Sequence, residues 1–254
     1  MFNILNYSVK SIMDKIREEG ITSIFKRTFH RIKKLFNLII LIHRIKKLKP
    51  NLNLNVLLNF LYLESKGMLI PFQNRYEILK LLKLVKKIKP KFILEIGTAK
   101  GATLFLFSRI AAEDAVIISV DLPGGNFGKG YPKWKIPLFK SFTFPKQTIN
   151  LIRANSHAIE TLNRVKSVLK SNRLDFLFID GDHSYEGIKK DFEMYSPLVD
   201  NNGIISLHDI ADCPLESKIF VSKFWNEIKE KYSYTEIIED KNQKGAGIGI
   251  LKVS

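Results

Sequence analysis

The 254-residue chain has an ordinary globular composition, 45% hydrophobic and 26% charged residues, but a net charge of +16. Its single cysteine, Cys213, excludes a disulfide framework and a cysteine-based zinc site, and is typical of a protein in a reducing compartment. The first residues lack the charged-then-apolar order of a secretory signal, so we expect a cytoplasmic protein.

The positive charge is concentrated in the first third of the chain. Residues 1–90 carry 19 Lys or Arg against 5 Asp or Glu, whereas residues 91–254 carry 22 against 20. Between residues 20 and 63 there is no acidic residue at all. A surface of this charge can face nucleic acid or an anionic membrane, and charge alone does not choose between them.

Residues 23–50 are predicted to form a basic amphipathic helix or a helix pair. The apolar centre, residues 35–42, is far shorter than the roughly 20 residues needed to span a bilayer, and the sequence RIKK flanks it on both sides. Such a helix can lie on an anionic membrane surface, here the inner face, or it can pack on a partner or on the main domain as a solvated helix. We therefore expect residues 1–66 to form a basic helical N-terminal extension and residues 67–254 to form the main domain.

From residue 71 onward, strand and helix patterns alternate. A helix over 74–88 precedes strands expected at 91–97, 115–121, 148–154, 174–180 and 203–209, and helices expected at 101–112, 157–170, 184–196 and 217–232. The segments 234–240 and 245–253 read as a closing antiparallel hairpin. This order predicts an α/β fold, a Rossmann-like, doubly wound, mostly parallel seven-stranded sheet, with its ligand beyond the carboxyl ends of the strands.

The turn after the first strand, LEIGTAKGAT, suits a nucleotide-like cofactor. Gly97 permits a tight turn and Gly101 allows close approach of the backbone to a ligand, with Glu95, Thr98 and Thr103 beside them. Ala99 interrupts the dinucleotide fingerprint G-x-G-x-x-G, which disfavours an NAD-dependent dehydrogenase, and no P-loop is present. A purely structural turn is the alternative.

The next two strand ends extend the predicted cofactor site. Asp121 follows Gly101 by 20 residues, where a carboxylate can accept hydrogen bonds from both ribose hydroxyls; alternatively it is a surface residue that opens a turn. Asn155 and Ser156 follow the third strand and are expected beside an adenine, whereas His157 is expected at a helix start.

Carboxylates and imidazoles end both the fourth and the fifth strands. Adjacent parallel strands would bring Asp180 close to Asp209, and a divalent cation would offset their repulsion, although acids that merely solvate the strand ends are the alternative. Oxygen ligands favour Mg²⁺ or a similar hard ion, and a nitrogen from His208 would admit Mn²⁺. His183 is then placed as a general base, and Ser184 as the cap of the following helix.

Together these motifs resemble class I S-adenosylmethionine-dependent methyltransferases. The likeness covers residues 67–252 and is most specific in IDGDHSYEG and the later HDI; it is closest to the cephalosporin hydroxylase-like and rhamnosyl O-methyltransferase group. It implies metal-assisted methyl transfer to a hydroxyl of a sugar, glycolipid or secondary metabolite. The roles that the resemblance implies are the methionine part of the cofactor for Gly97, Thr98, Gly101 and Thr103, the ribose for Asp121, the adenine for Ser156, the metal for Asp180 and Asp209, and the base for His183.

Residues 124–145 have no clear period and contain six aromatic side chains. An active-site lid that binds a ring-containing acceptor is one interpretation, and a surface loop held by its own aromatic residues is the other.

Two other functions remain open at this point. The basic N-terminus suggests a nucleic-acid methyltransferase, but the chain lacks an Asn/Asp-Pro-Pro-aromatic motif and its second half is nearly neutral, which disfavours a nucleic-acid partner. A non-catalytic membrane-surface adaptor with a methyltransferase fold is the second. A homo-oligomer is also left open.

Overall fold

The computed structural model describes residues 21–254; the first 20 residues of the predicted N-terminal extension lie outside the described part. Contacts divide the chain into two compact units, one that ends at Ile45 and one from Lys46 to Ser254. The two units are considered separately below.

The first unit is described by a single helix, α2 (Ile21–Lys47), rather than a helix pair. The helix is unbroken because its 27 residues include no glycine or proline, and it ends shortly before Pro50. Over residues 21–254, no helix combines the length and apolar character needed to cross a membrane.

The second unit begins with helices that precede the sheet. They are α3 (Leu54–Asn59), which continues into a π-helical turn, η1 (Phe60–Glu64), and α4 (Arg75–Ile88). The Asn74 side chain accepts a hydrogen bond from the Tyr76 backbone N–H and caps α4, which ends at a left-handed Lys89 just before Pro90. The predicted helix at 74–88 is thus confirmed.

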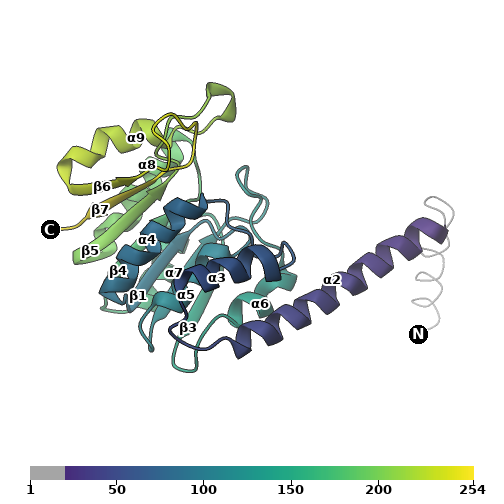
Figure 1. The fold of residues 1–254 in the computed structure, drawn as a ribbon. Helices are drawn as coiled ribbons and strands as arrows, with labels where there is room; N and C mark the ends of the chain where they lie inside the picture. The colour runs from purple at the N-terminus through teal and green to yellow at the C-terminus, as the bar shows by residue number, and fades with distance from the viewer. Residues whose placement is uncertain (1–20) are drawn as a thin grey trace. The chain divides into compact units, whose positions relative to one another are not determined.

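The sheet has seven strands in the order β3-β2-β1-β4-β5-β7-β6 (Figure 1). Its strands are β1 (Phe92–Ile96), β2 (Val116–Asp121), β3 (Thr148–Arg153), β4 (Leu174–Ile179), β5 (Val199–His208), β6 (Ser233–Ile237) and β7 (Ile248–Lys252). The first five strands run parallel, and β7 inserts antiparallel between β5 and β6. The predicted fold, including its closing antiparallel hairpin, is confirmed.

Alternate residues of the buried strands face helices on opposite sides of the sheet. One face packs on α7 (Ile159–Leu169), α8 (Tyr185–Tyr195) and α9 (Val221–Ile228) in a continuous apolar core. On the other face, Phe107 of α5 (Ala102–Ile110) contacts Phe176 and Phe178 of β4 with ring centroids 5.0 and 5.2 Å apart. Because helices cover both faces of the sheet, we expect the ligand site at the carboxyl ends of the strands.

The strand register brings four chain segments to one edge of the sheet. Ile96 at the end of β1 lies opposite Val120 of β2 and Ile179 of β4, and Ile179 lies opposite Leu207 of β5. The residues that follow these positions are therefore neighbours in space, although more than 100 residues separate the first from the last.

The insertion at 124–145 contains a 3₁₀ turn, η2 (Lys133–Lys135), and a short helix, α6 (Ile136–Lys140). The side chains of Tyr131, Phe139 and Phe142 are buried, and Phe139 packs on both of the others. These three rings are part of the core, so their faces are not available to an acceptor. Trp134 is partly exposed and does not line the pocket described next.

Candidate active site

A pocket of about 490 Å³ opens at the carboxyl ends of the parallel strands. Its wall includes the turn after β1 at Gly97, Asp121 at the end of β2, Asn155 after β3, Asp180 after β4 and Asp209 after β5. This volume is within the range of small-molecule and cofactor sites. The pocket therefore lies where the sequence predicted a ligand.

The turn after β1 can be built only with glycine at its first position. Gly97 has φ +93°, and a Cβ there would lie 1.9 Å from the carbonyl oxygen of Asp180. Gly101 also has positive φ, but a Cβ there would meet the Phe139 ring at 2.4 Å rather than a ligand. Packing against Phe139 therefore explains Gly101, which does not line the pocket.

Glu95 lies beneath this turn and is completely buried. Its carboxylate does not reach the pocket wall and lies beside the Thr103 and Thr98 side chains. Burial raises the pKa of Glu95 to about 8; the Thr103 and Thr98 hydroxyls oppose this rise, and the nearby charges of Asp121 and Asp180 add to it. Thr103, on the first turn of α5, is likewise buried outside the pocket wall.

Asp121 is fixed by backbone donors while it lines the pocket. One oxygen accepts from the Thr98 N–H at 3.2 Å, and the other accepts from the Tyr131 N–H at 2.8 Å. Burial raises the pKa of this carboxyl, and these backbone hydrogen bonds oppose the rise. Because each carboxylate oxygen can accept more than one hydrogen bond, Asp121 keeps capacity for ligand hydroxyls.

The segment after β3 forms another part of the pocket wall. The Asn155 side chain accepts a hydrogen bond from the His157 N–H at 2.9 Å, and the Ser156 carbonyl accepts one from the Tyr195 hydroxyl at 2.7 Å. Both residues line the pocket, as does His157, whose Nε2 lies 3.3 Å from the buried carboxylate of Asp191. The loop is thus held by one internal hydrogen bond and by contacts with α8.

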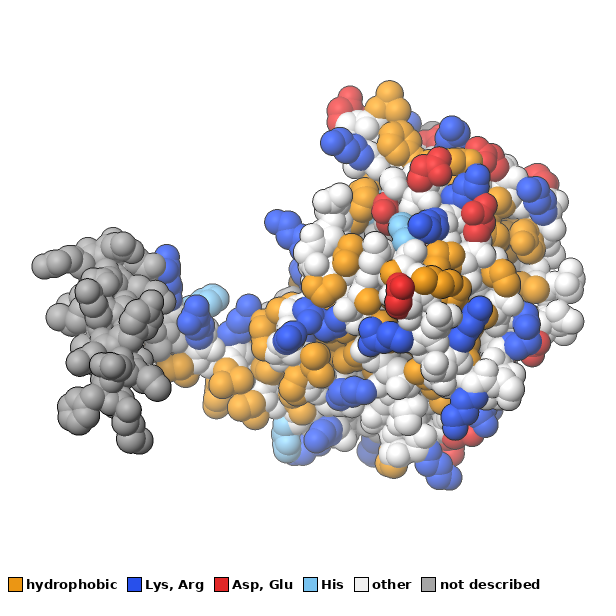
Figure 2. All heavy atoms as spheres, turned by 180° about the vertical axis from the view of Figure 1, so that it is seen from behind, with side chains coloured by type: hydrophobic (Ala, Val, Ile, Leu, Met, Phe, Trp, Pro, Cys, Tyr) orange, Lys and Arg blue, Asp and Glu red, His pale blue; other side chains and the backbone are white. Residues whose placement is uncertain are grey.

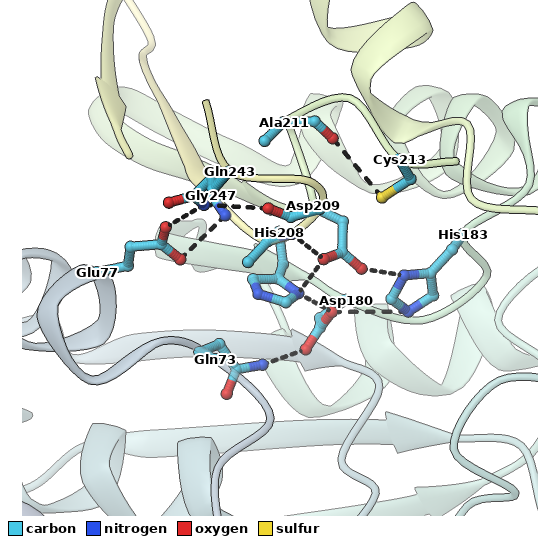
Figure 3. A network of polar contacts seen from close by, with 12 residues as sticks. Gln73, Glu77, Asp180, His183, His208, Asp209, Ala211, Cys213, Gln243 and Gly247 are labelled. Carbon is cyan, nitrogen blue, oxygen red and sulfur yellow. Dashed lines mark hydrogen bonds and ion pairs between the residues drawn. The ribbon is translucent and has the colours of Figure 1, made fainter. Parts of the chain in front are cut away.

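Two carboxylates and two imidazoles meet where β4 and β5 end (Figure 3). His183 Nδ1 lies 2.6 Å from Asp209 Oδ2, and His208 Nδ1 lies 2.9 Å from Asp180 Oδ1. Cross-contacts are longer, with His183 Nε2 3.7 Å from Asp180 Oδ1 and His208 Nδ1 3.4 Å from Asp209 Oδ1. The four side chains therefore form one electrostatic unit.

The two imidazoles can offset the electrostatic repulsion between the carboxylates of Asp180 and Asp209. Burial disfavours ionisation of Asp209, but the charge of His208 and the hydrogen bond to His183 outweigh it and hold the Asp209 pKa below its ordinary value. Burial likewise opposes protonation of both histidines, whereas the carboxylates raise the pKa of each. Charge balance at this site can thus be reached with protonated histidines as well as with a cation.

The donor set also suits a divalent metal. Ligand atoms of Asp180, His183 and Asp209 all lie within 4.8 Å of one another, which matches carboxylate and imidazole coordination. In this set the nitrogen comes from His183. His208 instead directs Nδ1 at Asp180, and its Nε2 is buried without a hydrogen-bond partner among the described residues.

Two polar residues that the sequence analysis did not single out support the carboxylates. Gln73 donates to Asp180 Oδ2 at 2.6 Å. Glu77 is completely buried in α4 and accepts from the Gln243 side chain and from the Gly247 N–H (Figure 3). The backbone N–H of the preceding residue in this loop, Ala246, donates to Asp209 Oδ1 at 3.1 Å.

The sequence contains a pattern that marks Glu77 as a buried carboxylate. It lies four and eight residues before Leu81 and Val85, both buried, so the helical period places a carboxylate on the apolar face of α4. Nothing comparable marks Gln73, which stands in the loop before the helix.

One aromatic residue of the 124–145 insertion does reach the pocket. The Phe127 ring packs on the His183 ring, with centroids 4.9 Å apart and planes inclined by 32°. Both residues line the pocket. An apolar ring on one face of the imidazole limits its contact with water on that side.

Residues 94–210 match the family model described as a methyltransferase domain. This range spans β1 to the end of β5 and includes every strand end that contributes to the pocket. The chain has the fold of O-methyltransferases of known structure, and its residues 94–210 are similar to the methyltransferase-domain family.

Solved structures with this fold include several O-methyltransferases. The enzyme from Bacillus cereus, in complex with SAH, is 16% identical with a TM-score of 0.54, over 80% of this chain and 93% of that one. TomG from Streptomyces achromogenes, in complex with SAM and involved in tomaymycin synthesis, is 14% identical with a TM-score of 0.52, over 82% and 92%. CalS11, a TDP-rhamnose 3′-O-methyltransferase of calicheamicin biosynthesis, is 16% identical with a TM-score of 0.52, over 84% and 93%.

Among curated proteins, the chain is similar to the uncharacterized protein y4gI of Sinorhizobium fredii, with 26% identity over 148 residues. The match covers 57% of this chain and only 16% of that much longer protein.

Proposed function

We propose that this class I methyltransferase domain transfers the methyl group of S-adenosylmethionine to a hydroxyl group, with His183 as the general base. The observation that carries the proposal is the contact between His183 Nδ1 and Asp209 Oδ2 at 2.6 Å, in the wall of the pocket at the strand ends. An imidazole oriented by a carboxylate is a usual arrangement for a residue that removes a proton.

The pocket wall suits the cofactor. Asp121 would bind the ribose hydroxyls, and Asn155 with Ser156 would lie beside the adenine. Gly97 would face the methionine part, because its turn adjoins both Asp121 and Asp180, whereas Thr98 is buried outside the pocket wall and would act by holding Asp121 through its backbone N–H. Glu95, Gly101 and Thr103 would shape this turn from beneath it. When bound, the cofactor supplies an electrophilic methyl group on a sulfonium leaving group.

Proton removal then falls to the imidazole. With Nδ1 held by Asp209, the Nε2 atom of neutral His183 can accept the acceptor's hydroxyl proton as the oxygen attacks the methyl group. Asp209 stabilises the imidazolium that forms, and the Phe127 ring restricts water on one face of the base. Alignment of the acceptor oxygen with the methyl group is the remaining contribution of the pocket.

A divalent metal, Mg²⁺ or a similar ion, is the finer part of the proposal. Asp180 and Asp209 would supply oxygen ligands, with a histidine nitrogen from His208 as the sequence suggests; the donor distances favour His183 instead, but a metal on its nitrogen would take the place of its role as the base. Because imidazole binds metal only when neutral, metal binding would release the protons that the carboxylates now favour. Such an ion would lower the pKa of a hydroxyl bound beside it.

For the acceptor we propose a hydroxyl of a sugar, a glycolipid or a secondary metabolite. Support comes from the likeness to a TDP-rhamnose 3′-O-methyltransferase and to an enzyme of tomaymycin synthesis, at a level of identity that conveys the fold only. A nucleic-acid acceptor is disfavoured by the near-neutral charge of residues 91–254.

Calorimetric titration of S-adenosylhomocysteine into the full chain tests the cofactor first. Stoichiometric micromolar binding that Asp121→Asn weakens at least about tenfold would support the proposal, because that substitution removes one charged hydrogen-bond acceptor. Absence of binding to the folded protein would refute it and favour the non-catalytic adaptor. Repeating the titration with Mg²⁺ and then with a chelator tests the metal separately.

A further inference from the structure

The helix α2 presents one continuous apolar stripe to its surroundings. Its residues with large hydrophobic side chains that are 57–74% exposed are Phe25, Phe29, Ile32, Leu35, Phe36 and Ile39. At 100° per residue these positions fall within an arc of about 120°, which is the spacing of a single helix face. Six such side chains on one face form a patch of the kind that marks an interaction surface.

The remainder of the same helix is strongly basic. Between residues 21 and 47 there are eight lysines and arginines and no acidic residue. Over the length of the stripe, Lys26, Arg31 and Lys33 fall outside the apolar arc on both of its sides. Figure 2 shows hydrophobic and basic side chains side by side on this helix.

We propose that this stripe of α2 docks the protein on the surface of an anionic membrane. The helix would lie parallel to the bilayer, with the stripe at the boundary between headgroups and acyl chains and the basic side chains among anionic headgroups. It would rest on the surface, because no described helix is long and apolar enough to cross the bilayer.

Charge and apolar character together select this partner over others. A nucleic acid would match the lysines and arginines but would leave six large apolar side chains in water. A second copy of α2 would cover the stripe but would bring two sets of cations, without acidic residues, close together. Residues 1–20 carry three basic and three acidic residues, so their sequence offers no excess negative charge to match the helix.

The proposal is independent of the methyl-transfer reaction, although both could act together. A membrane-docked enzyme would be positioned for a lipid-linked hydroxyl acceptor, which is one of the acceptor classes proposed above. Vesicle binding and cofactor binding are separate measurements, so failure of one proposal would not be mistaken for failure of the other.

Co-sedimentation of the full chain with vesicles tests the surface. The vesicles contain phosphatidylcholine alone or with about one third phosphatidylglycerol. The variant is Phe25→Ser/Phe29→Ser/Phe36→Ser, and the matched control is Leu63→Ser/Leu215→Ser, which removes two other side chains that are each 77% exposed. Circular dichroism and urea denaturation verify that each variant is folded.

We expect the unaltered chain to bind anionic vesicles, and the triple variant to bind about 100-fold or more weakly, since three aromatic rings no longer leave water. The control should bind as tightly as the unaltered chain. Lys26→Gln/Arg31→Gln/Lys33→Gln should also bind more weakly, and its binding should depend less on salt.

Three results would overturn the proposal. One is no vesicle binding by the unaltered chain, and another is equal loss in the control and the triple variant. The last is a dimer, seen by light scattering, that the triple variant abolishes while its vesicle binding remains.

Discussion

At the scale of single residues, the candidate active site rests on side chains whose charge depends on their neighbours. Asp209 adopts φ +63°, an uncommon conformation for a non-glycine residue, and it keeps contacts with His183, His208 and the Ala246 N–H. Backbone strain of this kind is maintained where surrounding contacts fix the residue. The conformation brings the Asp209 carboxylate into contact with both imidazoles.

Removal of the base tests the catalytic assignment. His183→Ala should lower turnover by at least about 100-fold, because general-base catalysis contributes that much, with cofactor affinity nearly unchanged. Turnover with a panel of hydroxyl acceptors and calorimetry with S-adenosylhomocysteine measure the two effects. His157→Ala is a matched control, since it removes another imidazole of the pocket wall that touches neither carboxylate of the cluster.

The raised pKa of Glu95 predicts that the stability of the protein depends on pH. Its pKa of about 8 in the folded protein lies above the ordinary value of 4.5, so the folded state binds the extra proton. Stability from this residue is therefore fully present below pH 4.5 and is lost as pH rises to about 8. Glu95→Gln should flatten the decline in the free energy of unfolding across this window, measured by urea denaturation at several pH values. An unchanged pH profile would show that Glu95 is ionised in the folded protein.

At the scale of elements, the loop between β6 and β7 is tied to α4 by a buried carboxylate. Glu77 accepts from Gln243 at 2.7 Å and from the Gly247 N–H at 3.0 Å. The same loop reaches Asp209 through Ala246. Helix α4, which precedes the sheet in sequence, thereby positions an active-site residue that follows β5.

Disruption of this tie should affect both stability and catalysis. Glu77→Ala leaves the Gly247 N–H buried without its acceptor, so we expect a loss of about 1–3 kcal/mol in the free energy of unfolding and a lower turnover. Glu77→Gln, which retains an acceptor oxygen for one of the two donors, should recover part of both. Lys83→Ala serves as a control because it alters an exposed side chain of the same helix. Full activity of Glu77→Ala would show that α4 does not position the candidate active site.

At the scale of the whole molecule, the sheet was predictable because its strands are apolar runs that end in Gly, Asp or His. The order of those ends placed Asp121, Asp180 and Asp209 at one edge without knowledge of any side-chain contact. The tail read as a hairpin because turn residues separate two short strands. The register confirms this reasoning, since Ile96, Ile179 and Leu207 lie side by side.

Contacts between distant segments were not predictable in this way. The roles of Gln73 and Glu77 depend on how the helices before the sheet meet the loops after it, over 107 and 170 residues of sequence. Likewise, the aromatic residues of the 124–145 insertion gave no period, so the burial of Tyr131, Phe139 and Phe142 could not be distinguished from exposure to a ligand. Composition shows what can be buried, whereas tertiary packing determines what is buried.

The position of β7 has a consequence for synthesis on the ribosome. Because β7 is made last yet lies between β5 and β6, the sheet stays open beside β5 until residue 252 has been translated. Until then the edge of β5 is unpaired, and Asp209 lacks the backbone donor that Ala246 provides. A nascent chain halted before Ile248 would therefore have an unpaired, aggregation-prone strand edge and an incomplete candidate active site. We expect such a chain to require protection from aggregation and to lack the proposed methyl-transfer activity.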